Sequence, residues 1–136
     1  MNQDEEKIVP WMLEPFGDFR SSMALEVAQN EFRIQGLELD YSIVCWDGDF
    51  TWDGGQWISR KISGDDWNNP GDEDELAVRS NAYRVLLTRA RKGMVIFVPE
   101  GDLEKISSRR DETRSPEIFE KVKDSLIASG VEELSD

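Results

Sequence analysis

The chain has 136 residues, enough for one domain with a buried core, and its 38% hydrophobic content is typical of a globular protein with a polar surface. Its formal net charge of −13 argues against independent binding to nucleic acids or anionic membranes, because phosphate contacts need a basic surface. Cys45 is the one cysteine and histidine is absent. This composition excludes an intramolecular disulfide, a cysteine-built zinc site and catalysis by Ser-His-Asp or Cys-His arrangements.

The N-terminal residues 1–10 are acidic and contain no apolar core, which indicates a flexible lead-in and not a signal peptide. Residues 11–19 combine apolar side chains with Pro15 and Gly17 and predict an anchored loop. No apolar run approaches the length of a membrane span. We therefore expect a cytoplasmic protein that has no membrane partner.

Two short apolar stretches predict the first strands. The sequence MALEVA, residues 23–28, is bounded by polar residues and predicts a strand. Gly36 then predicts a turn that leads into a brief helical turn. The sequence YSIVCW, residues 41–46, is apolar and β-branched, which predicts a parallel strand buried on both faces.

Residues 47–75 differ in composition from the segments around them and predict an insertion of hairpin and loop. They are rich in Gly, Asp, Asn and Trp. The sequence DGG, residues 53–55, lies between two strand-like stretches and predicts a β-hairpin. The sequence NNPGDEDE, residues 68–75, predicts a loop whose acidic residues favour the N-terminus of the next helix.

The remaining chain predicts helix, strand and helix. Apolar residues recur at helical spacing from Leu76 through Arg91, and Gly93 marks the end of this helix. The sequence MVIFVP, residues 94–99, predicts a second buried strand. Ser115-Pro116 predicts the start of a last helix that Gly130 closes. This order of elements predicts the α/β class.

Basic residues gather between the predicted helix and the second buried strand: Arg84, Arg89, Arg91 and Lys92. On a helix, Arg84 and Arg91 would share one face with Thr88. One interpretation is a solvated helix end, because cations stabilise helix C-termini. The other is an arginine finger, in which a fixed guanidinium reaches a phosphate during its transfer. Spacing alone leaves both interpretations open.

A second candidate group lies in the turn before the strand at 41–46. It contains Gln35, Gly36, Glu38 and Asp40. A glycine in such a turn lets the backbone approach a ligand closely, and a carboxylate two residues later can accept a hydrogen bond from a ribose hydroxyl. The alternative is a plain turn with exposed acidic side chains.

Two metal-binding patterns are incomplete, so no metal site is predicted. SIVCWDGD is similar to the strand that ends in a magnesium-binding aspartate in P-loop ATPases, but no Gly-Lys pair occurs in the sequence. DGDFTWDGG lacks the closing glutamate of an EF-hand. The tryptophans of this region can stack on bases or sugars, but the surrounding acids favour packing within the hairpin: Trp46, Trp52, Trp57 and Trp67.

The segments LEVAQNEFRIQGLELDYSIVCWDGDF, residues 25–50, and NAYRVLLTRARKGMVIFVPEGD, residues 81–102, resemble the C-terminal part of the Schlafen-group DNA/RNA helicase-like family. This family belongs to the superfamily-one helicases, which have two RecA-like lobes. QGLELD resembles motif V of that superfamily and VLLTRAR resembles motif VI. The resemblance begins at about Trp11 and includes RSS at 20–22 and DETRSPEIFE at 111–120.

The resemblance implies a partial RecA-like second lobe over residues 11–130, with a three-layer sheet, the hairpin insertion and a tail at 131–136. It implies that Arg89 is the catalytic motif VI arginine that reaches the γ-phosphate of ATP. The candidate nucleotide contacts that it implies are Gln35, Gly36, Glu38 and Arg84. The family usually carries threonine where this chain has Asn30, so a nucleic-acid backbone contact is not carried over to that position.

Family members carry the P-loop and the magnesium-binding aspartate in an N-terminal lobe, and this sequence contains neither. We therefore expect no ATPase activity from the chain alone. ATP would bind in a composite site completed by a P-loop lobe in cis or in trans, and nucleic acid would bind the complete motor. The alternative is a stand-alone interaction module derived from a helicase lobe, which binds a protein partner or forms a homodimer through an unpaired sheet edge.

Overall fold

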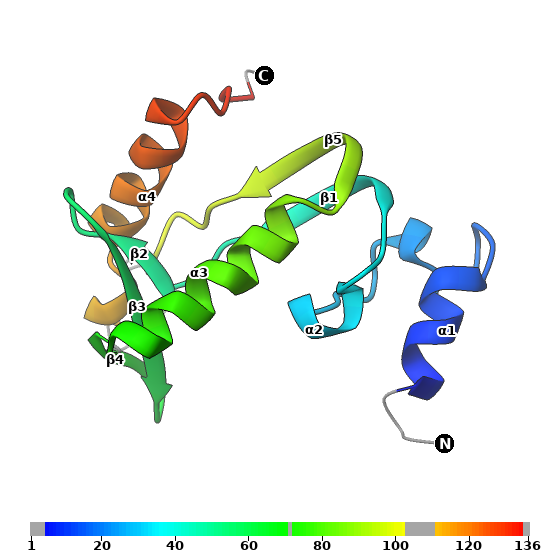
Figure 1. Cartoon of the computed structure of the whole chain (residues 1–136), viewed down its shortest axis with the longest axis horizontal. Coiled ribbons are helices and arrows are strands. Elements are labelled where there is room, and N and C mark those ends of the chain that lie inside the picture. Colours follow the sequence, from blue (N-terminus) through cyan, green and yellow to red (C-terminus); the bar gives the residue numbers. More distant parts are fainter. Residues whose placement is uncertain (1–4, 71, 103–110, 135–136) are drawn as a thin grey trace. The chain divides into compact units, whose positions relative to one another are not determined.

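The computed structural model of the protein describes residues 5–70, 72–102 and 111–134 (Figure 1). It divides into two compact units, residues 1–37 and 38–136, and each unit is described by itself. The first unit contains helix α1 (Glu5–Leu13), a 3₁₀ helix (Ser22–Ala24) and helix α2 (Glu31–Ile34). The second contains strands β1 (Leu39–Cys45), β2 (Phe50–Trp52), β3 (Trp57–Ser63) and β4 (Asp66–Pro70), helix α3 (Glu73–Leu87), strand β5 (Ala90–Phe97), a 3₁₀ helix (Glu112–Arg114) and helix α4 (Pro116–Ala128).

The first unit is helical where the sequence predicted other structure. Helix α1 covers residues for which no helix was expected. The strand predicted at 23–28 is wrong, because the Ser21 hydroxyl accepts a hydrogen bond from the amide of Met23 and begins a 3₁₀ turn. Leu25 ends that turn with φ of 59°, a left-handed conformation that interrupts an extended chain and that few leucines adopt.

Helix α2 leads into the turn that the sequence predicted at Gly36. The side chain of Asn30 caps the helix by accepting a hydrogen bond from the amide of Arg33, with an oxygen–nitrogen distance of 3.2 Å. Gly36 has φ of 84°, which confirms the turn and requires glycine-like freedom of the backbone. The brief helical turn is α2 and comes before Gly36, so the prediction that the turn leads into it is wrong.

Strands β1 and β5 form a two-stranded parallel sheet, which confirms both predicted strands and their parallel direction. Val44 lies opposite Ile96, and its side chain is only 4% exposed. On the other face, Ile43 is 54% exposed and Phe97 is 57% exposed. The prediction that these strands are buried on both faces is therefore wrong, because side chains alternate between a packed face and an exposed one.

Helix α3 ends earlier than its apolar spacing predicted. It ends at Leu87 with Thr88 as C-cap, and strand β5 begins at Ala90. The backbone carbonyl of Arg89 accepts a hydrogen bond from the amide of Leu39 at 2.9 Å, so strand pairing replaces a further helical turn. The prediction that the helix continues through Arg91 is wrong, and so is the helical face predicted for Arg84, Thr88 and Arg91.

The predicted hairpin is confirmed. Strands β2 and β3 are antiparallel, with Trp52 opposite Trp57. The carboxylate of Asp53 accepts hydrogen bonds from the amides of Gly55 and Gln56 at 2.7 and 2.8 Å, which stabilises the tight turn. Strand β4 pairs with β3 and adds a third strand that includes Asn68 to Pro70, so the loop prediction is wrong for these residues.

The core of the second unit lies where α3, α4 and the hairpin sheet meet. Its buried residues are Trp46, Phe50, Tyr83, Val122 and Leu126. The ring centroids of Trp46 and Tyr83 are 4.3 Å apart, and those of Phe50 and Trp57 are 4.6 Å apart. Packing with the hairpin is thus confirmed for Trp46, Trp52 and Trp57. Helix α4 confirms the predicted last helix.

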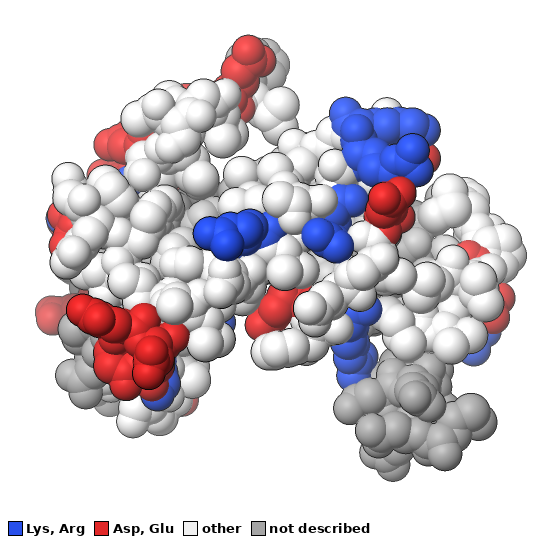
Figure 2. All heavy atoms as spheres, viewed as in Figure 1, with Lys and Arg blue, Asp and Glu red and all other residues white. Residues whose placement is uncertain are grey.

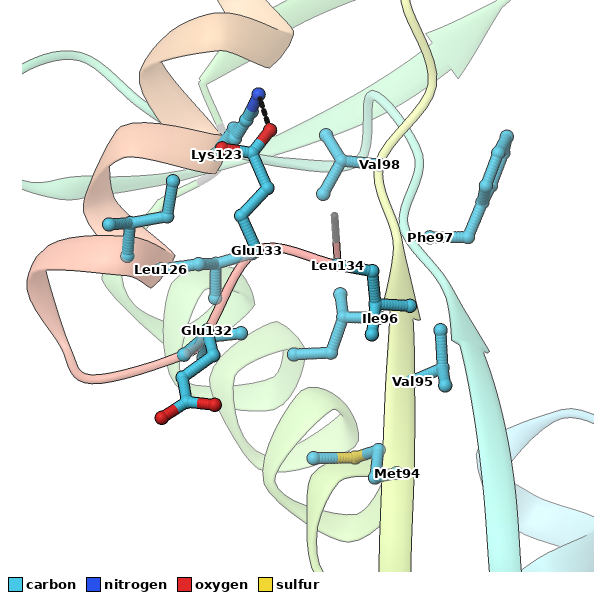
Figure 3. Close-up of a pocket in the computed structure, with 12 residues that line it drawn as sticks. Met94, Val95, Ile96, Phe97, Val98, Lys123, Leu126, Glu132, Glu133 and Leu134 are labelled. Atoms are coloured by element: carbon cyan, nitrogen blue, oxygen red, sulfur yellow. Dashed lines mark ion pairs between the residues drawn. The ribbon is translucent and has the colours of Figure 1, made fainter. Parts of the chain in front are cut away.

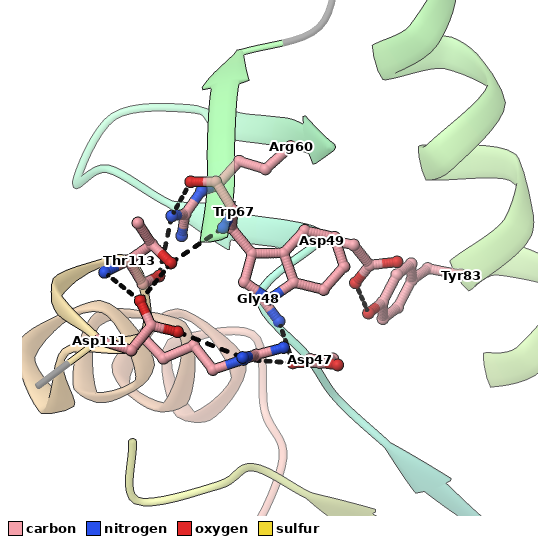
Figure 4. Close-up of polar contacts among 9 residues, drawn as sticks. Asp47, Gly48, Asp49, Arg60, Trp67, Tyr83, Asp111 and Thr113 are labelled. Carbon is pink, nitrogen blue, oxygen red and sulfur yellow. Dashed lines mark hydrogen bonds and ion pairs between the residues drawn. The ribbon is translucent and has the colours of Figure 1, made fainter. Parts of the chain in front are cut away.

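Asp49 joins the hairpin to α3 through two polar contacts. The Tyr83 hydroxyl donates a hydrogen bond to one carboxylate oxygen of Asp49 at 2.6 Å (Figure 4). The guanidinium of Arg79 lies 2.7 Å from the other oxygen. Burial, followed by the charge of Asp49, raises the pKa of the Tyr83 phenol far above its ordinary value. The raised pKa keeps the phenol protonated at neutral pH, so the hydroxyl serves as the donor in this hydrogen bond.

A second polar network ties the segment before α4 to the hairpin sheet (Figure 4). The guanidinium of Arg60 donates to the backbone carbonyls of Trp67 and Thr113 at 2.9 and 2.8 Å. The hydroxyl of Thr113 accepts from the amide of Trp67 at 2.9 Å, and Arg114 lies over the Trp67 ring. The hydroxyl of Thr113 donates to Asp111 and is the first cause of a pKa of that carboxyl below its ordinary value.

The structure therefore confirms the α/β class, with one parallel sheet and one antiparallel sheet. The RecA-like lobe and its limits at 11–130 stay predictions. The tail at 131–136 does too, and its last two residues lie outside the described residues. No helix in the described part of the chain is both long enough and apolar enough to cross a lipid bilayer.

We expect Asp49→Ala to lower the free energy of unfolding by about 2 kcal/mol, because Tyr83 and Arg79 lose their acceptor while they remain partly buried. Urea unfolding followed by tryptophan fluorescence measures the change. Asp124→Ala is the matched control, since Asp124 lies exposed on α4, and it should change the value by less than about 0.5 kcal/mol. Equal effects of the two substitutions would contradict the role of Asp49.

We expect the network around Asp111 to weaken in acid. The pKa of Asp111 in the folded state lies below its ordinary value of 3.8, so its contribution to stability is present above that pH and is lost as the pH falls through the folded-state pKa. Asp111→Asn should therefore reduce the loss of stability between about pH 6 and pH 3. Urea midpoints of both proteins across this range test the prediction, and parallel curves would contradict it.

Candidate functional site

Glu38 and Arg89 lie at the same end of the parallel sheet, where both strands begin. Leu39 and Ala90 are paired in the register of β1 and β5, and the amide of Leu39 donates to the carbonyl of Arg89 at 2.9 Å. Glu38 and Arg89 each come immediately before one of these paired residues. Because the strands are parallel, both residues stand where their strands begin. Two residues that are 51 positions apart in the sequence thus flank one hydrogen bond.

The side chain of Arg89 turns back to the end of helix α3. Its Nε donates to the backbone carbonyl of Val85 at 3.1 Å, and one Nη donates to the hydroxyl of Thr88 at 3.1 Å. The last carbonyls of a helix carry partial negative charge, which attracts a guanidinium. The side chain is half-buried, so the helix end positions a cation that still reaches solvent.

Arg84 lies exposed in the last turn of α3. Its guanidinium donates to the side-chain oxygen of Asn81 at 2.9 Å, and its backbone carbonyl accepts from the hydroxyl of Thr88 at 2.7 Å. Thr88 therefore contacts both arginines, one through the backbone and one through the side chain. The end of α3 thus carries Arg84 and leads directly to Arg89.

Two ion pairs cross between the starts of β1 and β5. Glu38 lies 3.3 Å from Arg91, and Asp40 lies 2.9 Å from Lys92. The side chains of Glu38 and Arg91 are 75% and 66% exposed, so water screens their attraction. Figure 2 shows Lys and Arg side chains gathered at the end of the sheet where β5 begins. This end combines exposed cations with a carboxylate that solvent reaches.

The structure describes Gln35 and Gly36 within the first unit. Gln35 follows α2 as its C-cap, and Gly36 turns the chain with its positive φ. A β-carbon built on Gly36 would meet no atom within 4 Å. Glycine is therefore required here by the backbone conformation, and the space beside it is open.

The sequence did not reveal the role of Asp49. Asp49 lies within the incomplete metal-binding patterns of the sequence, and its carboxylate contacts Tyr83 and Arg79. Among residues 5–70, 72–102 and 111–134, no group of three or more His, Cys, Asp or Glu side chains is placed to hold a metal ion. A single aspartate that follows an apolar strand is the only signal, and it does not identify partners 30 and 34 residues away.

The end of the sheet where β1 and β5 begin is suited to a ligand that carries an anionic group close to a hydroxyl group. Guanidinium groups form directed, charge-assisted hydrogen bonds with phosphate oxygens, and an exposed carboxylate accepts from hydroxyl groups. Arg89 and Glu38 provide one group of each kind from adjacent strand starts.

We expect Glu38→Gln and Arg91→Ala each to change the free energy of unfolding by less than about 0.5 kcal/mol, because exposed ion pairs contribute little to stability. Urea unfolding measures these values. Asp49→Ala serves as the contrasting variant, since its carboxylate is only 15% exposed. A large loss of stability from Glu38→Gln would show that the carboxylate is structural, and would remove the reason to regard it as a ligand-binding group.

Comparison with known proteins identifies the family. The family model described as Schlafen group 3, DNA/RNA helicase domain, matches residues 2–100, which is well over half of the chain. The match includes β1, α3 and β5 with both candidate groups, and it ends before α4 and the segment at 111–120. No curated protein and no solved structure matched the chain. The chain therefore belongs to the Schlafen group 3 DNA/RNA helicase-domain family.

Proposed function

We propose that this helicase-like module supplies Arg89 and Glu38 to a composite ATP site that a P-loop lobe completes. Arg89 would act as the arginine finger on the γ-phosphate, and Glu38 would accept a hydrogen bond from the ribose. The chain alone would not hydrolyse ATP, since its sequence contains no Gly-Lys pair for a P-loop.

The hydrogen bond between the amide of Leu39 and the carbonyl of Arg89 carries this proposal. It fixes the starts of β1 and β5 side by side, so that in this proposal a single ligand at the strand starts would contact both Glu38 and Arg89. The two residues are positioned by paired strand starts, which hold groups more rigidly than a loop does, and the register of the strands shifts just after this pair, between Leu39 and Tyr41. Family membership supports a helicase-like role for such an edge.

The position of Arg89 suits an arginine finger that contacts the phosphate while the phosphoryl group is being transferred. Two of its hydrogen bonds go to neutral acceptors, the carbonyl of Val85 and the hydroxyl of Thr88. A phosphate is a stronger acceptor for a guanidinium than either of them, so the side chain can exchange these bonds for phosphate contacts. Negative charge that grows on the phosphoryl oxygens during transfer would then be stabilised by a cation already fixed at a helix end.

The other candidate contacts have supporting roles in the proposal. Arg84 would add positive charge at the same helix end, where its guanidinium is exposed. Gln35 and Gly36 lie in the first unit and remain candidate contacts on the resemblance alone. We further propose that the parallel sheet of β1 and β5 is part of a RecA-like second lobe, and that nucleic acid binds only the complete two-lobe motor.

The proposal is tested by mixing this chain with a P-loop lobe of a Schlafen-group helicase and measuring ATP turnover. We expect turnover to require both polypeptides. Arg89→Ala should lower kcat by roughly a thousandfold, and Arg89→Lys should restore little of it, because lysine lacks the planar fork of donors. Glu38→Gln should act mainly on KM, because its contact is with the ribose.

Lys92→Ala is the matched control, since it removes a cation from the same sheet end without touching either proposed contact. It should leave turnover nearly unchanged. Equal turnover by the Arg89→Ala variant and the unaltered chain would contradict the finger role. Turnover by the isolated chain would contradict the composite site.

A further inference from the structure

We propose that the second unit holds a binding site for a small aromatic acid, in a cavity between the hairpin sheet and helix α4. The cavity has a volume of about 360 Å³, which lies within the range of small-molecule sites. Residues of β2, β3 and β4 line it together with residues of α4. None of its lining residues belongs to the ATP site proposed above, so this inference does not depend on that site.

Two cations line the cavity, Arg60 of β3 and Lys121 of α4. Acidic residues outnumber basic ones by 29 to 16 in this chain, so carboxylate partners for cations are plentiful. Even so, no ion pair within residues 5–70, 72–102 and 111–134 includes Arg60 or Lys121. Both charges are therefore available to an anion that enters the cavity.

Arg60 also has hydrogen-bond donors that the fold does not use. One of its Nη atoms donates to the backbone carbonyls of Trp67 and Thr113, at 2.9 and 2.8 Å (Figure 4). Its Nε and its other Nη make no hydrogen bond with the described part of the chain. Burial lowers the pKa of Arg60, and the charge of Arg114 adds to this effect while that of Asp111 opposes it. An anion beside the guanidinium would offset the cost of this burial.

The apolar part of the cavity is suited to a flat ring. Trp52 and Trp67 line it, and Ile58 and Ile118 add aliphatic surface. Indole rings present large apolar surfaces that pack well against other aromatic groups. A ligand that combines a planar ring with an acid group therefore matches the cavity better than a simple anion does.

One carboxylate also lines the cavity, that of Asp53 at the hairpin turn. Hydrogen bonds from the amides of Gln56 and Gly55 are the main cause of a pKa of this carboxyl below its ordinary value, and the charge of Lys121 contributes. Asp53 is therefore ionised at neutral pH. The side chains around the cavity then carry one net positive charge, from two cations and one anion, which favours an anionic ligand.

The groove between β5 and α4 has a different chemistry (Figure 3). Its charged lining residues are Lys123, Glu132 and Glu133, and the ammonium of Lys123 pairs with Glu133. These side chains carry one net negative charge, from one cation and two anions, so the groove disfavours an acid. Lys123 lies on the same helix as Lys121 and therefore provides a matched control.

Calorimetric titration of the full chain with four probes tests the proposal. Naphthoate and naphthyl phosphate each carry a ring and an acid group, whereas naphthamide lacks the charge and acetate lacks the ring. We expect both aromatic acids to bind with dissociation constants between about 10 μM and 1 mM, and the other two probes to bind at least about tenfold more weakly. The tighter of the two aromatic acids identifies the acid group, carboxylate or phosphate, that the site prefers.

Three variants locate the site. Lys121→Gln should weaken binding of the aromatic acids roughly fivefold, because an exposed cation contributes modestly to binding an anion. Lys123→Gln makes the same change of charge outside the cavity and should change the dissociation constants by less than about twofold. Ile118→Phe narrows the cavity without changing its charge and should weaken binding at least about tenfold. Urea unfolding verifies that each variant is folded.

Equal affinities for naphthoate and naphthamide would overturn the proposal, because the cations would then play no part in binding. A loss of affinity in Lys123→Gln as large as that in Lys121→Gln would also overturn it, and so would an affinity that a folded Ile118→Phe variant leaves unchanged. The absence of binding of either aromatic acid up to about 10 mM would overturn it as well.

Discussion

The contact between Tyr83 and Asp49 fixes helix α3 on the hairpin sheet, and the elements that follow α3 depend on that contact. Tyr83 donates its hydroxyl proton to Asp49 while its ring packs against Trp46 and Phe50. One residue thus belongs to the polar link and to the aromatic core at once. Because only Thr88 and Arg89 separate α3 from β5, the hairpin that holds α3 also holds the point from which β5 starts.

This dependence gives the insertion at 47–75 a role in the candidate site that its position in the sequence does not suggest. The hairpin holds α3, and the C-terminus of α3 binds the guanidinium of Arg89. The hydrogen bond from Leu39 then sets the starts of β1 and β5 beside each other. The positions of Arg89 and Glu38 therefore have two causes: the packing of α3 against the hairpin and the pairing of β1 with β5.

The sequence predicted the elements with local signals and missed those that depend on distant contacts. The hairpin was predictable because Asp53 and the two glycines after it form their turn without outside help. The end of α3 was not, because the apolar spacing continues to Ala90 and only Leu39, far away in the sequence, favours a strand there. The left-handed Leu25 has no sequence signal. The order of the motifs in the sequence identified Arg89 and Glu38 as candidates. The ion pair between Glu38 and Arg91 was not predictable, because it depends on how β1 and β5 are paired.

The link between α3 and β5 is only two residues long, Thr88 and Arg89, and this shortness restricts how the segment can vary. One added residue would turn the helix end by about 100° relative to the strand. It would also exchange the inward and outward side chains of β5, so that Ile96 would leave the core and Phe97 would enter it. This two-residue link therefore sets both the rotation of α3 about its axis and the choice of which β5 side chains face the core. Length at this position is therefore constrained more tightly than residue identity, and a change in length would disturb the core and the sheet edge together.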